Sequence, residues 1–390
     1  MARMVFNALA VLAAIAAAFY QFYLKDVLVL IGYNRVIEPI GNKDCHHIPE
    51  LRACEKISLH QPSGRLFLAC SEPNRRTQWL PAGERLNKAG ASQDYVAIYD
   101  PTTSKVAKLK FSGVDENFDF SSHGMDVVPS ASNPSELFVY LVNHRPPRGL
   151  GLDPQETGAD SVLEIFQHKL GSNTLTHIKT FESPLIISPN DVVGSDDGTS
   201  LYFTNDHGQK LGIARRLDPI LKRKSTSVVY CNIKTGCKYA IQNMISNNGI
   251  ARALNGTLYV AATWPGTISV LEEQSDNTLV ITDYIKTEYP MDNLSIDSEG
   301  HVWAAAFPKV LKIVGDHFKD PKVACPSTVL RLSVNTGPNA FYGDKYKIEK
   351  AFEDDGHVAS GSTSAIYDVQ RKKLFIHGPL YLVSIGSPNP

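Results

Sequence analysis

A short pattern of residues recurs along the chain and constrains its fold more than any other feature. In each copy a polar residue precedes an apolar run, a turn follows, and a second run rich in β-branched and aromatic side chains completes the unit. The clearest copy spans residues 188–207 and carries the polar pair Asn190 and Asp191 near its start. The other copies begin at the following positions: Glu55, His123, Asn248, Asp292 and, more weakly, Ser364.

Six copies of a strand, a turn and a strand indicate a repeat architecture. The β-branched and aromatic residues, together with the glycine-containing turns, favour a β-propeller among the repeat folds. We therefore expect an all-β, six-bladed β-propeller with an N-terminal hydrophobic helix. The expected domains are an anchor segment in residues 1–34 and a six-bladed β-propeller domain in residues 35–390.

The polar residue at the start of each copy is the candidate functional position. The innermost strands of a propeller line its central channel, so these residues are expected to converge from different blades. A single Asn or Asp before a strand is more often a turn cap, but its recurrence at equivalent positions favours a shared site. Carboxylate and amide oxygens are the ligands that calcium prefers. The converging set is Glu55, His123, Asn190, Asn248, Asp292 and Asn293.

The N-terminal residues 4–24 contain no charged side chain and lie between Arg3 and Lys25. This run is long enough to cross the hydrocarbon core of a bilayer, and aromatic residues gather at its end as in an interfacial belt. We predict a retained signal-anchor; the alternative is a signal peptide cleaved near Ala16–Ala18. Either interpretation places the protein in the secretory pathway, membrane-anchored with a lumenal or extracellular domain, or secreted.

Charge and cysteine content limit the remaining possibilities. The formal net charge is −1, so nothing points to a nucleic-acid partner. An oxidising compartment permits disulfides among the six cysteines, but their connectivity cannot be deduced from sequence. Cys231 and Cys237 flank a turn and either close a hairpin or remain thiols, and Cys45 and Cys54 are a second candidate pair. Asn255-Gly-Thr257 is a glycosylation sequon in an expected turn.

From Cys45 onwards the motifs follow an order that resembles the paraoxonase/arylesterase family of six-bladed propellers. Each motif is weak alone, whereas the ordered set is specific. The apolar N-terminal segment is also similar to the uncleaved segment of family members. The matching segments are residues 54–57, 118–124, 141–144, 190–191, 204–207, 247–250 and 291–295.

The resemblance implies calcium-dependent hydrolysis of a lactone or an aryl ester. Calcium would bind the substrate carbonyl oxygen and stabilise the oxyanion of the tetrahedral intermediate. His123 would take a proton from the attacking water, and His144 would orient or polarise His123. The implied metal-binding set is Glu55, Asn190, Asp191, Asn248, Asp292 and Asn293.

Three positions depart from the family pattern. Lys56 stands where the family usually has an Asp that binds a second, structural calcium in animal members. We expect its ammonium to lie beside Asp191 and replace that ion, which leaves one catalytic calcium. The family's disulfide between the two ends of the chain would use Cys45, but there is no cysteine near the C-terminus. Phe307 stands in place of a pocket histidine.

A second function class remains: a non-hydrolytic propeller similar to strictosidine synthase-like proteins, or a membrane-tethered binding module. The oxygen cage combined with His123 favours the hydrolase, because a binding module needs no such combination. A serine hydrolase is disfavoured since the chain has no Gly-x-Ser-x-Gly motif. The expected partners are a small lactone or aryl ester and, through the N-terminal segment, a membrane.

Overall fold

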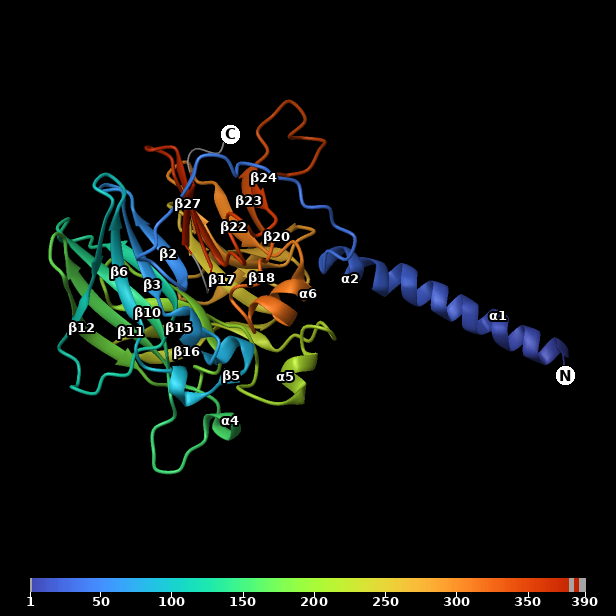
Figure 1. Cartoon of the computed structure of the whole chain (residues 1–390), viewed down its shortest axis with the longest axis horizontal. Coiled ribbons are helices and arrows are strands. Elements are labelled where there is room, and N and C mark those ends of the chain that lie inside the picture. Colours follow the sequence, from blue (N-terminus) through green and yellow to red (C-terminus); the bar gives the residue numbers. More distant parts are fainter. Residues whose placement is uncertain (1, 379–381, 386–390) are drawn as a thin grey trace.

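Five four-stranded sheets and one five-stranded sheet follow one another along the chain (Figure 1). The computed structural model describes residues 2–378 and 382–385. The first three sheets, in pairing order, consist of β2 (Cys54–His60), β3 (Arg65–Cys70), β6 (Tyr95–Asp100) and β7 (Lys105–Lys108); β9 (Ser122–Pro129), β10 (Glu136–Arg145), β11 (Asp160–Lys169), β12 (Thr174–Phe181) and β8 (Lys110–Ser112); and β13 (Pro189–Gly194), β14 (Ser200–Asn205), β15 (Thr226–Asn232) and β16 (Gly236–Met244).

The other three sheets lie C-terminal to these. They consist of β17 (Asn247–Arg252), β18 (Leu258–Ala262), β19 (Thr267–Glu273) and β20 (Leu279–Lys286); β21 (Met291–Ile296), β22 (Val302–Ala306), β23 (Ser327–Val334) and β24 (Tyr346–Asp354); and β25 (Ser364–Asp368), β26 (Lys373–His377), β27 (Leu382–Ile385) and β1 (Cys45–His47). A separate ribbon pairs β4 (Trp79–Leu80) with β5 (Arg85–Leu86).

The first strands of the six sheets contact one another in a closed ring. β2 contacts β9, β9 contacts β13, and the contacts continue through β17 and β21 to β25, which returns to β2. The prediction of an all-β propeller is therefore confirmed. The copies are not identical, however: the sheet of the His123 copy has a fifth strand, because β8 pairs with β12 in parallel.

Burial explains why the inner strands lack the alternating pattern of a half-exposed strand. In β22 every residue is buried, since neighbouring sheets cover both faces. The outermost strand β20 instead alternates between buried and more exposed residues. Apolar side chains of adjacent sheets interlock between the blades; Phe67 of β3, for example, shares a cluster with Met125 of β9 and Leu141 of β10. Each fully buried side chain of this size contributes about 1.5–3 kcal/mol.

The strand β1, near the N-terminus, completes the last sheet. It pairs antiparallel with β27, so that Cys45 faces Ile385 and His47 faces Val383. The two ends of the propeller are thus joined by backbone hydrogen bonds. No cysteine faces Cys45 in this pairing, as the sequence implied.

The N-terminal apolar helix is also confirmed. It consists of α1 (Ala2–Phe19), a π-helical turn (Tyr20–Leu24) and α2 (Lys25–Leu30). The stretch Arg3–Leu30 has 28 residues, a mean hydropathy of 1.8 in its most apolar window and no burial in that window. α1 points away from the sheets (Figure 1). Length and composition suit either a membrane span or a signal sequence, so its retention stays a prediction.

Four short helices lie in the connections between strands. They are α3 (Pro73–Arg76), α4 (Pro154–Thr157), α5 (Ile213–Leu217) and α6 (Val310–Lys312), the last followed by a π-helical turn at Ile313–His317. Two 3₁₀ turns, Pro81–Gly83 and Lys88–Gly90, lie between β3 and β6.

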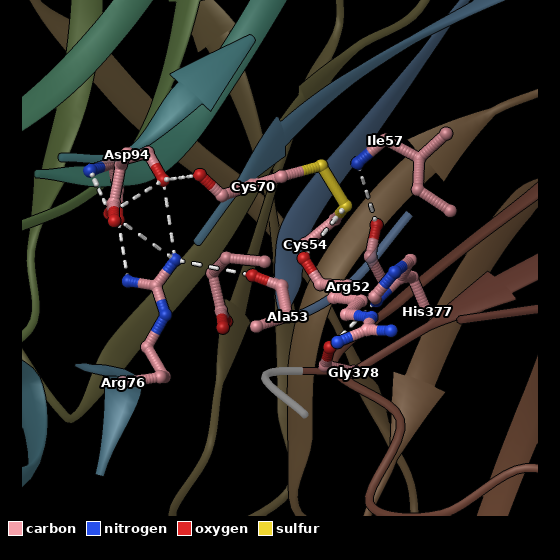
Figure 2. Close-up of a disulfide and its surroundings, with 12 residues drawn as sticks. Arg52, Ala53, Cys54, Ile57, Cys70, Arg76, Asp94, His377 and Gly378 are labelled. Atoms are coloured by element: carbon pink, nitrogen blue, oxygen red, sulfur yellow. Dashed lines mark hydrogen bonds and ion pairs between the residues drawn. A yellow bond between two sulfur atoms is a disulfide. The ribbon is translucent and has the colours of Figure 1, made fainter. Parts of the chain in front are cut away.

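Two disulfides form, and one of them corrects the sequence-based expectation. Cys231 and Cys237 close the β15–β16 hairpin, as one alternative predicted. The pairing of Cys45 with Cys54 is wrong, because Cys54 is bonded to Cys70, its direct partner on β3 (Figure 2). Cys45 and Cys325 are thiols.

We expect alkylation of the denatured, unreduced protein to modify Cys45 and Cys325 alone, with all six cysteines reacting after reduction. Peptide mass spectrometry measures both states. A Cys231→Ser variant should add one reactive thiol, at Cys237, as an internal control. Alkylated Cys54 or Cys70 in the unreduced wild-type protein would contradict the observed pairing.

Candidate active site

A β-bulge interrupts the innermost strand pair in five of the six sheets. Between Cys54 and Lys56, β2 advances two residues while β3 advances one, so Glu55 is the extra residue. Bulges re-aim side chains and are common beside active sites. The other register shifts lie at 189–192, 247–250 and 291–294 of β13, β17 and β21, and opposite 141–143 of β10. The β25–β26 pair, from the weak sixth copy, runs in register throughout.

Every bulge falls on a candidate residue of the sequence analysis. Two of the bulges also need a glycine, because neighbouring strands approach closely there. A Cβ on Gly124 would lie 2.4 Å from the carbonyl oxygen of Asn190, and one on Gly249 would lie 2.6 Å from the Cα of Asn293. The glycines after His123 and Asn248 therefore let the bulged strands meet at the channel.

One pocket of about 500 Å³ collects most of the predicted set. Its floor includes Glu55, His123, Asn190, Asn248 and Asp292. Asn293 and Asp191 are buried beside this floor and do not line the pocket, and His144 lies behind His123. The structure thus brings the predicted residues together in two layers.

The amide side chains of the floor present unpaired oxygens. The Nδ2 of Asn248 donates to Thr263 Oγ1 at 2.9 Å, and the Nδ2 of Asn190 lies 3.3 Å from His123 Nε2. The Oδ1 atoms of both residues are buried without a hydrogen-bond partner, as is Oδ1 of Asp191. Buried polar atoms are normally paired, so these three oxygens require an explanation.

Negative charge is concentrated at the same place. Burial raises the pKa of Asp292 well above its ordinary value, and the charges of Glu55 and Asp191 raise it further. Within residues 2–378 and 382–385, no three His, Cys, Asp or Glu side chains gather in a metal-binding arrangement. A cation here would rely on amide oxygens as well as carboxylates. The set of buried carboxylates and unpaired amide oxygens fits a hard cation such as calcium.

The two histidines are packed edge to face. The ring centroids of His123 and His144 lie 5.1 Å apart with an interplanar angle of 63°. His144 Nδ1 lies 2.7 Å from Ser161 Oγ, and the backbone oxygen of His144 accepts a hydrogen bond from Trp79 Nε1 at 2.8 Å. Burial lowers the pKa of both imidazoles, and the proximity of His123 lowers that of His144 further. Both rings are therefore neutral near pH 7, and His123 is able to accept a proton.

Lys56 occupies the expected place beside Asp191. Its Nζ lies 2.5 Å from Asp191 Oδ2 and donates to the carbonyl oxygen of Leu294 at 3.0 Å. Asp191 Oδ2 also accepts the backbone N–H of Ile250 at 2.9 Å. The two charged side chains are only 6% and 0% exposed. The prediction of an ammonium in contact with this carboxylate is confirmed.

Apolar side chains also line the pocket. Phe307 is one of them, in agreement with its predicted place, together with Trp264 and Phe318. Such a lining suits an uncharged aryl or alkyl group better than a charged one.

Sequence reasoning missed a polar cluster on the pocket wall. Asp206 Oδ1 accepts hydrogen bonds from His207 Nδ1 at 2.8 Å and from Ser188 Oγ at 2.5 Å. Burial opposes ionisation of Asp206, but His207 and Arg215 together hold its pKa well below the ordinary value. Arg215 is 2% exposed and donates to the carbonyl oxygen of Pro81. The matching segment 204–207 contains Asp206 and His207 but gave them no role, and Arg215 was not among the candidate residues.

We expect Lys56→Ala to destabilise the protein by about 3–5 kcal/mol, because the substitution leaves the Asp191 carboxylate buried without its cation. Urea unfolding measures the change. Lys345→Ala removes a surface ion pair with Asp283 and should leave the unfolding midpoint nearly unchanged. Adding Asp191→Asn to Lys56→Ala should recover part of the loss. An unchanged unfolding midpoint in Lys56→Ala would show that the pair is not important for stability.

The family model and the relatives that match this chain describe the same kind of protein. The family model described as Arylesterase matches residues 87–384. Serum paraoxonase/arylesterase 2 of Bos taurus is 30% identical over 89% of this chain and 89% of its own length. Serum paraoxonase/lactonase 3 of Mus musculus is 28% identical, covering 90% of this chain and 92% of its own. Serum paraoxonase/arylesterase 2 of Gallus gallus is 25% identical, covering 92% of this chain and 94% of its own length.

Proposed function

The chain belongs to the arylesterase family and is a carboxylic ester hydrolase, and we propose that it hydrolyses lactones and aryl esters with the help of one bound calcium ion. The observation that carries this proposal is the convergence of bulged strands on one pocket. It places two unpaired amide oxygens, from Asn190 and Asn248, with the carboxyl groups of Glu55 and Asp292, next to His123.

We propose that each of the six sheets is a blade of the propeller. The strand β9 occupies the ring of first strands in the same way as the other five, and β8 is added to the outer edge of its sheet, beyond β12. His123 therefore belongs to the same structural position as Glu55 and Asn190 in their blades. This equivalence supports a single central site.

The proposed calcium ligands are Glu55, Asn190, Asn248 and Asp292 from the pocket lining, together with Asn293 from the buried layer beside it, whose Oδ1 makes only a long contact of 3.5 Å with Lys56 Nζ. When bound, calcium supplies positive charge that polarises the substrate carbonyl and stabilises the developing oxyanion. Asp191 is assigned to the second layer, since its Oδ2 bonds Lys56 and Ile250. The Lys56 ammonium supplies a positive charge there without a second ion.

His123 is the proposed general base. The Nδ2 of Asn190 can only donate, so Nε2 of His123 is the acceptor in their contact and the atom that takes the proton from the attacking water. His144 packs against the His123 ring and is itself fixed by Ser161 and Trp79. Its role is to hold His123 in place. The apolar wall around Phe307 binds the aryl or alkyl part of the substrate.

The purified protein should contain one calcium ion per chain, measured by elemental mass spectrometry. Exhaustive chelation should abolish hydrolysis of phenyl acetate and of a γ- or δ-lactone, and calcium should restore it, because the oxyanion loses its stabilising charge. His123→Gln should keep the calcium and lower kcat by about 10²–10⁴-fold.

The matched control is His60→Gln, which alters another buried histidine of β2–β3, bonded to Ser63 outside the pocket, and should leave kcat unchanged. Activity that survives with metal content near zero would refute the mechanism. Two calcium ions per chain would refute the substitution of an ion by Lys56. Calcium binding without any hydrolysis would favour a non-hydrolytic propeller.

We also propose that the N-terminal helix is a retained signal-anchor and that Asn255 is glycosylated. The helix has no buried residue in its most apolar window, and Asn255 is exposed in the turn before β18. Both features fit a domain on the lumenal or extracellular side of a membrane.

Carbonate washing of membranes should leave the full chain in the pellet, because a spanning apolar helix is not released by high pH. Immunoblotting of pellet and supernatant, with N-terminal sequencing, measures this. A variant lacking residues 2–24 should appear in the supernatant of the same wash. Recovery of a soluble wild-type form that begins near Phe19 would show cleavage instead.

A further inference from the structure

The bulge that presents Glu55 is closed by a covalent bond. Cys54 and Cys70 face each other across β2 and β3 and form a disulfide (Figure 2). In the chain, this disulfide lies directly before the extra residue Glu55. At the corresponding end of the second strand, two other sheets use an asparagine. Asn143 accepts the N–H of Ser121, and Asn205 accepts the N–H of Ser188. The first sheet thus has a disulfide where these sheets have side-chain hydrogen bonds.

A buried arginine joins this end of β2 to the strand of His123. Arg76, the last residue of α3, is 3% exposed. Its Nη1 donates to the carbonyl oxygen of Ser122 at 2.7 Å, and its Nη2 donates to the carbonyl oxygen of Ala53 at 3.4 Å. These carbonyls lie one residue before His123 and two residues before Glu55. Figure 2 shows Arg76 directed at Ala53 and Asp94, beside the disulfide.

Ser122, the residue before His123, makes further hydrogen bonds. Asp94 Oδ2 accepts the backbone N–H of Ser122 at 2.8 Å and lies 3.8 Å from Arg76 Nη2. The hydroxyl of Ser122 lies 3.1 Å from Asp94 Oδ2 and 3.4 Å from the carbonyl oxygen of Cys70. The His123 segment is therefore hydrogen-bonded to one half of the disulfide as well as to Arg76.

We propose that the Cys54–Cys70 disulfide and Arg76 form a positioning clamp, which fixes the strand of Glu55 relative to the strand of His123. A guanidinium is planar and presents several donors at fixed angles, so it is able to hold two backbone carbonyls in one geometry. The bulge interrupts the ladder of hydrogen bonds at Glu55, and the clamp supplies the missing constraint. The catalytic consequence rests on the proposed function, while the mechanical coupling of the two strands does not.

The clamp predicts that loosening one strand loosens the other. In the full chain, Cys54→Ala/Cys70→Ala should accelerate amide hydrogen exchange about tenfold in residues 121–124 as well as in 53–57. Arg76→Lys keeps the positive charge but cannot bridge both carbonyls, so it should have the same effect. Cys231→Ala/Cys237→Ala removes the other disulfide, in a different sheet, and should leave both segments unchanged.

The test of function measures calcium binding first and the hydrolysis of phenyl acetate second. Groups that orient metal ligands typically affect affinity 10–100-fold, so calcium should bind about tenfold more weakly to both clamp variants by calorimetry. Their kcat should fall by a similar factor with KM within about twofold, because the pocket wall is unaltered. A role in global stability alone would lower the unfolding midpoint and leave calcium affinity and kcat intact.

The hydrogen-exchange and calcium-binding measurements distinguish failure of the clamp proposal from failure of the proposed function. Unchanged exchange in residues 121–124 of folded clamp variants would overturn the clamp. If the cysteine variant does not fold, Arg76→Lys decides the question by the same measurements. A wild-type protein that binds no calcium would refute the proposed function, and the exchange comparison would still test the coupling of the strands.

Discussion

The bulge repeated at the start of successive blades is the constraint on which the site depends. In a regular strand, successive side chains point to opposite faces of the sheet, so the polar residue of each copy would point to one of these faces. One extra residue breaks that alternation and aims the side chain along the channel. Glu55, Asn190 and Asn248 meet in one pocket because their strands share this irregularity, and β25, which lacks it, contributes no candidate ligand.

The charges of the site are balanced in two layers. Glu55, Asp191 and Asp292 are buried carboxyl groups, and Lys56 is the ammonium placed against one of them. The raised pKa of Asp292 indicates that its ionisation is unfavourable without further positive charge. A divalent cation among the unpaired oxygens would supply that charge. Beside Asp191, the Lys56 ammonium already supplies a positive charge.

The sequence indicated which residues converge on the pocket better than it indicated the contacts around them. Polar residues that interrupt apolar strands at a repeated position are visible without a structure, which is why Glu55, Asn190 and Asn248 were found. The disulfide was misassigned because nearness in the chain suggested Cys45, whereas strand register decides the partner of Cys54. Arg76 was not among the candidate residues, and only the folded structure shows that it is buried.

For the sheets too, local sequence patterns predicted the general architecture but not the contacts between distant segments. The repeat predicted the propeller, but the addition of β8 to the His123 sheet depends on a parallel pairing that no local pattern encodes. The roles of Asp206 and His207 were also missed, because they follow from a pocket wall assembled by β14 and the connection after it. Local patterns contain neither strand register nor the contacts between distant segments, and these decided the outcomes.

The pairing of β1 with β27 has a consequence for how the protein is made. β1 is synthesised before the other strands, whereas its partner β27 follows all of the other described strands. Until β27 has been synthesised, the ring stays open and the edge of β26 has unpaired backbone groups, which are prone to associate with other chains. Closure then joins the first strand to the last described one, and contacts so distant in sequence slow folding. A growing chain therefore presents an unpaired sheet edge until β27 is available to cover it.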